Sequence, residues 1–126
     1  MLEFTLRSEL RPGDIGAIAA LHGTLYAREY GFDHTFEAYV AGPLAEFALR
    51  NAPNERIWLA EQAGRLVGVV AIVAEDGDPA TAQLRWFLVD PSARGRGLGR
   101  RLLDTAIEFS RAAGYRRIVL WTVSAL

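Results

Sequence analysis

A glycine-rich segment between residues 94 and 99 carries the clearest chemical signal in this sequence. It reads R-G-R-G-L-G, follows F-L-V-D-P and precedes R-R-L-L. Glycine permits backbone conformations and close approach that a Cβ forbids, so several N–H groups can converge on one point. At a helix start, where the peptide dipoles favour negative charge, such a loop suits a phosphate. The arginines of this stretch add positive charge; they are Arg94, Arg96, Arg100 and Arg101.

Two common nucleotide-binding motifs do not fit this spacing. A P-loop requires a lysine, and all 14 basic residues of this chain are arginine. The dinucleotide fingerprint G-x-G-x-x-G fails because Arg100 stands at its third glycine position. A glycine-rich turn without a ligand is the simpler alternative, but three alternating glycines before an arginine-rich helix favour a phosphate-bearing ligand.

The first half of the chain predicts one strand and two helices. Apolar and polar residues alternate over residues 2–10, which is typical of a half-buried strand. Helical spacing follows over residues 15–30, with Asp14 as the expected N-cap. A second helix is predicted over residues 33–50, with a kink or break at Gly42-Pro43. Its expected inner stripe is Phe36, Tyr39, Val40, Leu44, Phe47 and Ala48.

The second half predicts strands around one further helix. The predicted strands cover residues 57–63, 66–74, 83–89 and 117–123, with a hairpin at 63–65 and a turn at 75–79. The helix covers residues 98–113 and ends at Gly114. The order β-α-α-β-β-β-α-β, with a parallel crossover at its end, predicts a single α/β domain over residues 1–126 with a mixed sheet.

Composition excludes several classes of protein. The formal net charge is -1 at pH 7, so we expect no nucleic-acid or polybasic membrane partner. The chain has no Cys, which excludes disulfides, thiolate metal sites and cysteine nucleophiles. No signal peptide is visible, and the longest apolar stretch, residues 66–74, is too short to span a bilayer. We expect a cytoplasmic protein with no metal, since His22 and His34 form no ligand set.

The glycine-rich segment resembles the acetyl-CoA signature [QR]-x-x-G-x-[GA] of the GNAT superfamily of N-acetyltransferases. Arg94, Gly97 and Gly99 occupy its specified positions. The predicted order of elements resembles that of the superfamily, so the likeness covers the whole chain. Residues 25–31 and 120–122 are similar, more narrowly, to GNAT domains fused to MarR-type regulators. The resemblance implies the acyl-CoA N-acyltransferase fold and direct transfer of an acetyl group from acetyl-CoA to a primary amine.

The resemblance also implies which residues contact acetyl-CoA. In the family, the pantetheine arm pairs with the backbone of the strand before the loop, and the loop amides hold the pyrophosphate. Carried over to this sequence, the implied residues are Phe87, Leu88, Val89, Arg94, Gly95, Arg96, Gly97, Leu98, Gly99 and Arg100. An ordinary place in the sheet core is compatible with this role for Phe87 and Val89, because the contacts are made by the main chain.

The catalytic residues are left unassigned. Many family members carry a Glu base near the start of the loop-bearing strand, and the matching position here is Gln83. An amide cannot take a proton at neutral pH, but it can orient a water. Glu75 and Asp76 are candidates if their hairpin reaches the site, and an exposed turn is the simpler interpretation.

The first two helices wall the acceptor site in such folds. Tyr26, Glu29 and Tyr30 are implied substrate-binding residues there, together with Gln83. Carboxylates beside aromatic rings suit a cationic amine. The alternative to substrate binding is that the two tyrosines pack on each other and that Glu29 is solvated. The acceptor is expected to be a small-molecule amine or a protein amine.

The family normally continues after the last predicted strand with a helix and two more strands. Since the sequence stops at Leu126, the resemblance implies a domain that is incomplete at its C-terminus. A fragment, a naturally shortened protein and a homodimer that covers the open edge all stay possible. So does a second class of function, a CoA-binding or regulatory module without catalysis.

Overall fold

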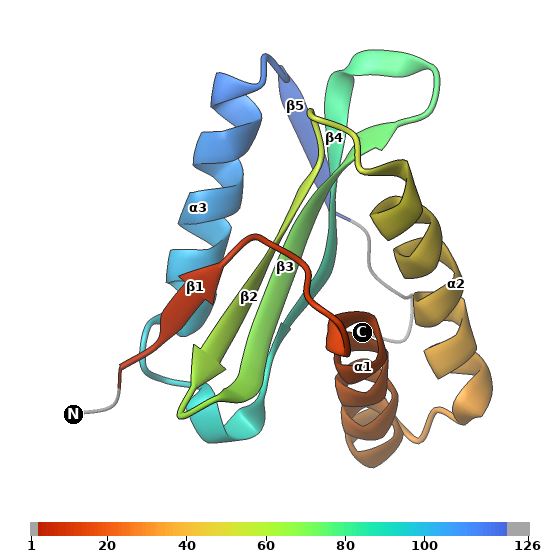
Figure 1. Cartoon of the computed structure of the whole chain (residues 1–126), viewed down its shortest axis with the longest axis vertical. Coiled ribbons are helices and arrows are strands. Elements are labelled where there is room, and N and C mark those ends of the chain that lie inside the picture. Colours follow the sequence, from red (N-terminus) through yellow and green to blue (C-terminus); the bar gives the residue numbers. More distant parts are fainter. Residues whose placement is uncertain (1–2, 121–126) are drawn as a thin grey trace. The chain divides into compact units, whose positions relative to one another are not determined.

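The structure, a computed structural model, describes residues 3–120 (Figure 1). The predicted order β-α-α-β-β-β-α-β is confirmed. In chain order the elements are β1 (Thr5–Arg7), α1 (Asp14–Tyr30), α2 (His34–Arg50), β2 (Arg56–Gln62), β3 (Arg65–Glu75), β4 (Asp78–Val89), the 3-10 helix η1 (Pro91–Ala93), α3 (Leu98–Ala112) and β5 (Arg117–Leu120). The remainder of the last predicted strand, from residue 121 to Val123, lies outside the described residues.

The chain forms two compact units. One contains α1 and α2, over residues 10–51, and the other contains the sheet and α3, within residues 3–9 and 52–120. In the second unit the strands lie in the order β1-β2-β3-β4-β5. All neighbouring strands are antiparallel except β4 and β5, which are parallel, so the predicted mixed sheet is confirmed.

Tight turns set the register of the two central hairpins. Ala63 and Gly64 both have positive φ, 52° and 76°, in the two-residue turn that brings Gln62 opposite Arg65. Two positive φ angles match the right-handed twist of the strands, which confirms the predicted hairpin. The next turn pairs Glu75 with Asp78, so β4 begins earlier than the predicted residue 83.

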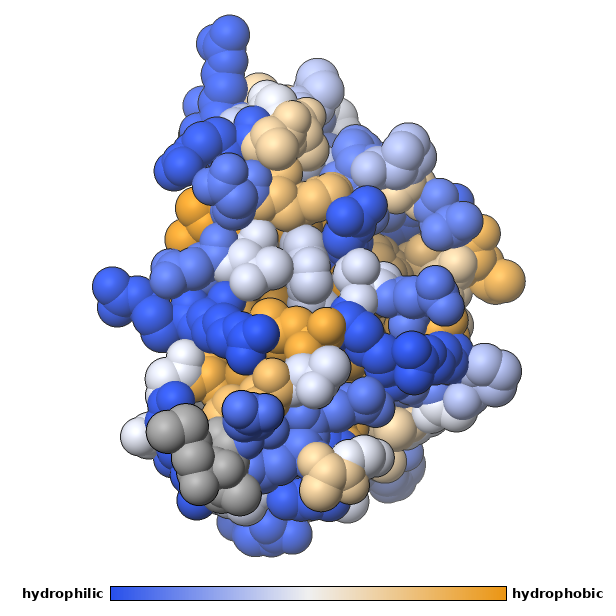
Figure 2. All heavy atoms as spheres, turned by 60° about the vertical axis from the view of Figure 1, so that its left-hand side comes forward, coloured by the Kyte–Doolittle hydropathy of each residue, from blue (hydrophilic) through white to orange (hydrophobic). Residues whose placement is uncertain are grey.

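Helix α3 covers one face of the sheet unit. Its buried residues Leu98, Leu102 and Ala106 belong to one apolar cluster with residues of the central strands, among them Val70 and Leu84. Its charged residues are exposed, and hydrophilic surface dominates the side of the molecule shown in Figure 2. The predicted amphipathic helix is therefore confirmed.

Glycine at position 68 allows α3 to approach β3 closely. A Cβ at Gly68 would lie 3.0 Å from Leu102 Cδ1 and 3.2 Å from Leu98 Cδ2. These separations are tighter than ordinary van der Waals contact, so a larger residue would force the helix or its side chains to move.

The helical unit differs from the sequence predictions at three points. Gly13 is the N-cap of α1, and Asp14 lies in the first turn, where its carboxylate accepts the backbone N–H of Arg11 at 2.6 Å. Helix α2 starts after the N-cap Asp33 and runs through Pro43, so the expected break is absent there. Pro43 has no N–H to donate to the carbonyl of Tyr39. Tyr39 is 56% exposed, so water can solvate this carbonyl. The same exposure shows that the predicted place of Tyr39 on the inner stripe was wrong.

No helix within residues 3–120 is both long enough and apolar enough to cross a membrane.

Replacing Leu102 by Ala should destabilise the fold strongly, because this fully buried side chain fills the contact between α3 and the sheet. We expect the free energy of unfolding to fall by about 2–5 kcal/mol in urea denaturation. Leu49→Ala is the matched control, since Leu49 is 87% exposed and should change stability by less than about 0.5 kcal/mol. Equal effects of the two substitutions would contradict the packing described here.

Candidate functional site

The glycine-rich segment forms a sharp connection between β4 and α3. Gly95 and Gly97 have positive φ angles of 78° and 82°, which L side chains rarely adopt. A Cβ at either glycine would meet no atom within 4 Å, so the outer side of the loop is open. The local fold therefore requires glycine for its backbone conformation, and the space beside the loop is accessible to a ligand.

Six successive backbone N–H groups gather in this loop. The first N–H bonded back into the helix is that of Arg101, which donates to the Gly97 carbonyl at 3.0 Å. The N–H groups of Ala93 and Arg94 close η1 by donating to Asp90 and Pro91. Among the described residues, none accepts from the N–H groups of residues 95–100. Together with the helix dipole, these donors suit an anion such as a phosphate.

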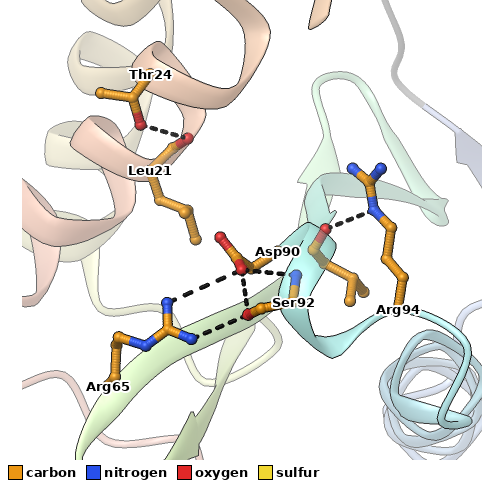
Figure 3. A network of polar contacts seen from close by, with 7 residues as sticks. Leu21, Thr24, Arg65, Asp90, Ser92 and Arg94 are labelled. Carbon is orange, nitrogen blue, oxygen red and sulfur yellow. Dashed lines mark hydrogen bonds and ion pairs between the residues drawn. The ribbon is translucent and has the colours of Figure 1, made fainter. Parts of the chain in front are cut away.

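Asp90, Ser92 and Arg65 form a clamp that holds the start of this loop (Figure 3). The Asp90 carboxylate accepts both the backbone N–H of Ser92, at 3.0 Å, and the Ser92 hydroxyl. Arg65, at the start of β3, donates to Ser92 Oγ at 2.9 Å, and its guanidinium lies 3.9 Å from the same carboxylate. No local pattern in the sequence predicts this clamp, because Arg65 stands 27 residues before Ser92.

The arginines of the loop have different partners. Arg94 donates from Nε to the Val89 carbonyl at 3.0 Å (Figure 3), and Arg100 pairs with Asp104 on the next turn of α3 at 3.7 Å. Arg101 instead donates to the Phe4 carbonyl at 3.1 Å. Its guanidinium thereby ties α3 to the N-terminal segment, and its expected place around the anion stays a prediction. Arg96 is exposed in the loop itself.

A β-bulge interrupts β4 just before the loop. Val69 pairs with Leu88 and Ala71 with Arg85, so Val70 stands opposite two residues, Trp86 and Phe87. Trp86 adopts a φ of 52°, an unfavourable conformation for a side chain with a Cβ, and the Arg85 guanidinium lies 5.0 Å from its ring centroid. Nothing in the sequence marked this position.

The hydrogen bonds between β3 and β4 after the bulge determine which backbone groups of β4 point away from β3. The Asp90 N–H donates to the Val67 carbonyl at 2.8 Å, so the backbone of Asp90 faces β3. Backbone groups alternate along a strand, so Val89 faces the opposite edge, whereas Leu88 faces β3. The bond from Arg94 to the Val89 carbonyl agrees with this assignment. The side chains of Phe87 and Val89 pack against the apolar cluster beneath α3, and Leu88 is buried.

Gln83 and Glu75 lie together on the sheet. Gln83, which is 8% exposed, donates from Nε2 to a carboxylate oxygen of Glu75. Its Oε1 is buried and has no hydrogen-bond partner within the described part of the chain. At the same end of β4, the Thr81 hydroxyl and the Ala80 N–H hold the pKa of Asp78 below its usual value, and Arg117 adds to this effect.

The three other implied substrate residues lie in the helical unit. The Tyr26 ring packs against Phe36, with 4.5 Å between centroids, and against Tyr30 and Phe32 at 5.3 and 5.9 Å. Glu29 is exposed, as is Tyr30, at 46%. Tyr26 and Tyr30 are thus brought together by ring packing. Across residues 3–120, no three metal-binding side chains form a cluster that could hold an ion.

Comparison with known families gives a match over most of the chain. The model of the acetyltransferase (GNAT) family matches residues 22–125. An uncharacterised N-acetyltransferase of Schizosaccharomyces pombe is 33% identical over 103 residues, which cover 80% of this chain and 62% of the relative. Across eight of the curated relatives, the chain spans between 22% and 62% of the relative's full length.

Solved structures share the fold at low sequence identity. A GNAT-family acetyltransferase of Staphylococcus aureus superposes with a TM-score of 0.78 at 19% identity, over 98% of this chain and 75% of its own. A predicted acetyltransferase of Clostridium acetobutylicum, solved with acetyl-CoA, gives 0.73 at 16% identity, over 98% and 82% of the two chains.

Substituting Ala at Gly97 and at Gly99 should separate the two roles of glycine in this loop. Gly97→Ala should lower the free energy of unfolding by about 1–2 kcal/mol, because the positive φ is unfavourable for any residue with a Cβ. Gly99→Ala should stabilise the fold by up to about 1 kcal/mol, because its Cβ would meet Val89 and Phe87 only at ordinary distances of 3.7 and 3.8 Å in a helix. Urea denaturation of both variants checks this order, and a more stable Gly97→Ala variant would exclude the described loop conformation.

Proposed function

Because this chain belongs to the acetyltransferase (GNAT) family, we propose that it binds acetyl-CoA at the loop between β4 and α3 and transfers the acetyl group to a primary amine. The observation that carries the proposal is the run of N–H groups of residues 95–100, for which the described part of the chain supplies no acceptor. A pyrophosphate offers acceptor oxygens and negative charge together, and so suits this position.

The surroundings of the loop support a donor of this chemistry. Arg96 is exposed in the loop, and Arg100 lies in the first turn of α3, which has no acidic residue. Residues 95–100 and Arg94 would hold the phosphates. The outward backbone groups of Val89, and of Phe87 beside the bulge, would pair with amides of the pantetheine arm. The backbone of Leu88 faces β3, so we propose no contact from it.

The transfer itself needs three functions from the protein. The nitrogen of a neutral amine attacks the acetyl carbonyl carbon, the carbon–sulfur bond breaks, and the sulfur keeps its electron pair and takes up a proton. The protein must hold the amine beside the thioester, polarise the carbonyl and accept the proton that the nitrogen loses. Outward N–H groups of β4 near the bulge suit the second function.

The acceptor site is proposed to include Tyr26, Glu29 and Tyr30. The exposed Glu29 and the partly exposed ring of Tyr30 suit a cationic amine, whereas Tyr26 is engaged by the rings around it. The acceptor is a small-molecule or protein amine. The narrower likeness to domains fused to MarR-type regulators stays a prediction.

One observation favours a second candidate function, a CoA-binding or regulatory module without catalysis. The position that often carries a Glu base in the family is occupied here by an amide, Gln83, within β4, and an amide cannot take a proton at neutral pH. Binding and turnover therefore need separate measurements.

Calorimetric titration of acetyl-CoA into the purified chain tests the first step. We expect a Kd of about 1–100 µM. A Gly97→Glu, Gly99→Glu variant should bind at least about 100-fold more weakly, because two added carboxylates would repel the pyrophosphate beside the loop. Gly16→Glu is the matched control, since a Cβ there meets nothing within 4 Å on a different helix, and it should leave the affinity unchanged. Absence of binding by the folded parent protein would refute the proposal.

Release of free CoA thiol in the presence of an amine tests the second step. Tyramine, spermidine and a peptide with a free N-terminus serve as acceptors, and the absence of Cys from the chain removes any protein background from a thiol reagent. We expect amine-dependent thiol release with at least one of them. Tight acetyl-CoA binding with no release for any amine would support the non-catalytic module.

A further inference from the structure

We propose that Glu75 and Gln83 form a catalytic pair, in which Gln83 holds the acceptor amine and Glu75 takes its proton. This inference rests on the acetyl transfer proposed above. It assigns the proton-accepting role to a carboxylate on β3, which neighbours the strand that carries the loop.

The register of the sheet places both residues on one face. Gln83 pairs with Val73 on β3, and Glu75 lies two residues beyond Val73. The pairing is irregular between Ala74 and Glu75, but the bond from Gln83 Nε2 to Glu75 shows that the two side chains lie together. Their face is opposite to the one covered by α3, because the neighbours of Gln83 on β4, Ala82 and Leu84, belong to the apolar cluster beneath that helix.

The orientation of the Gln83 amide follows from its partner. An ionised carboxylate only accepts hydrogen bonds, so the nitrogen of the amide, and not its oxygen, bonds to Glu75. That oxygen is buried and has no donor within residues 3–120. Buried acceptors in folded proteins are almost always satisfied, so this one points to a donor outside the described residues. The N–H of an amine substrate is such a donor.

Other carboxylates at this end of the sheet are already engaged by the protein. Glu55 accepts the Ala74 N–H at 2.9 Å, and Asp78 accepts from Thr81, from Ala80 and from Arg117. Asp76 is exposed in the turn that joins β3 to β4. The carboxylate bonded to the same amide group is therefore that of Glu75, which is only half-buried and so retains access to solvent for release of the proton.

Gln83 lies on β4, the strand along which the donor is proposed to bind, and Glu75 lies on the neighbouring strand β3. From the phosphate loop, β4 runs back through Val89 and the bulge at Trp86 to Gln83. In the proposed step, Gln83 Oε1 accepts one N–H of the amine while the nitrogen bonds to the acetyl carbon. Glu75 then takes the proton that the nitrogen loses, and the sulfur leaves with the electron pair of the broken carbon–sulfur bond.

Exchanging the two functional groups tests the pair. We expect Glu75→Gln to lower kcat/KM for the best amine of the panel by at least about 100-fold, as loss of a general base does, while the Kd for acetyl-CoA changes less than twofold. The double variant Glu75→Gln, Gln83→Glu restores one carboxylate and one amide with their places exchanged, and should recover at least tenfold of the loss. Glu108→Gln, the same change on the exposed side of α3, is the control and should have no effect.

The outcomes separate this inference from the proposed function. If the parent protein transfers acetyl groups and Glu75→Gln keeps its rate within threefold, or the exchanged variant recovers nothing, the pair is refuted and the transferase stands. If the parent binds acetyl-CoA but acetylates no amine, both proposals fall.

A measurement on the unaltered protein guards against variants that do not fold. The side-chain amide signals of Gln83, assigned by their loss in Gln83→Met, should shift in a ¹H–¹⁵N spectrum when the amine is added to the CoA complex. Unmoved Gln83 signals at a saturating amine concentration would overturn the inference.

Discussion

The close contact between α3 and β3 at Gly68 determines where the candidate site lies. Because position 68 has no side chain, Leu98 and Leu102 can pack directly over the sheet. The first turn of the helix is thereby held beside the end of β4, where the Gly99 backbone faces Val89 and Phe87. Gly95, Arg96 and Gly97, which precede that turn, are exposed. A phosphate site at this point is thus a consequence of core packing as much as of loop composition.

Features that depend on local sequence were predictable. The spacing of apolar residues revealed the order of strands and helices, and three glycines between a strand and a helix revealed the loop. Features that join distant segments were not predictable. The contact from Arg65 to Ser92 spans 27 residues and that from Arg101 to Phe4 spans 97. A single sequence contains no signal for such pairs, because many arginines could form them equally well.

Polar residues within strands were the hardest to interpret from sequence. Gln83 looked like a weak substitute for a base when it was considered alone, and Glu75 looked like part of an exposed turn. The sheet register changes both interpretations, since it joins the two residues by a hydrogen bond. The aromatic residues around Tyr26 show the reverse. Their helical spacing allowed either a binding site or simple packing, and the rings of Tyr26 and Phe36 do pack on each other.

The bulge at Trp86 constrains how the length of β4 can change during evolution. Before it, Ala82 and Leu84 face the apolar cluster under α3, and after it Phe87 and Val89 do so. Odd and even positions therefore exchange faces within the strand. Loss of one residue between the bulge and the loop would turn the last apolar side chains away from the helix and invert which backbone groups face outward. Insertions and deletions in this region should accumulate in the Asp76-Gly77 turn, where a change of length alters neither face of the strand.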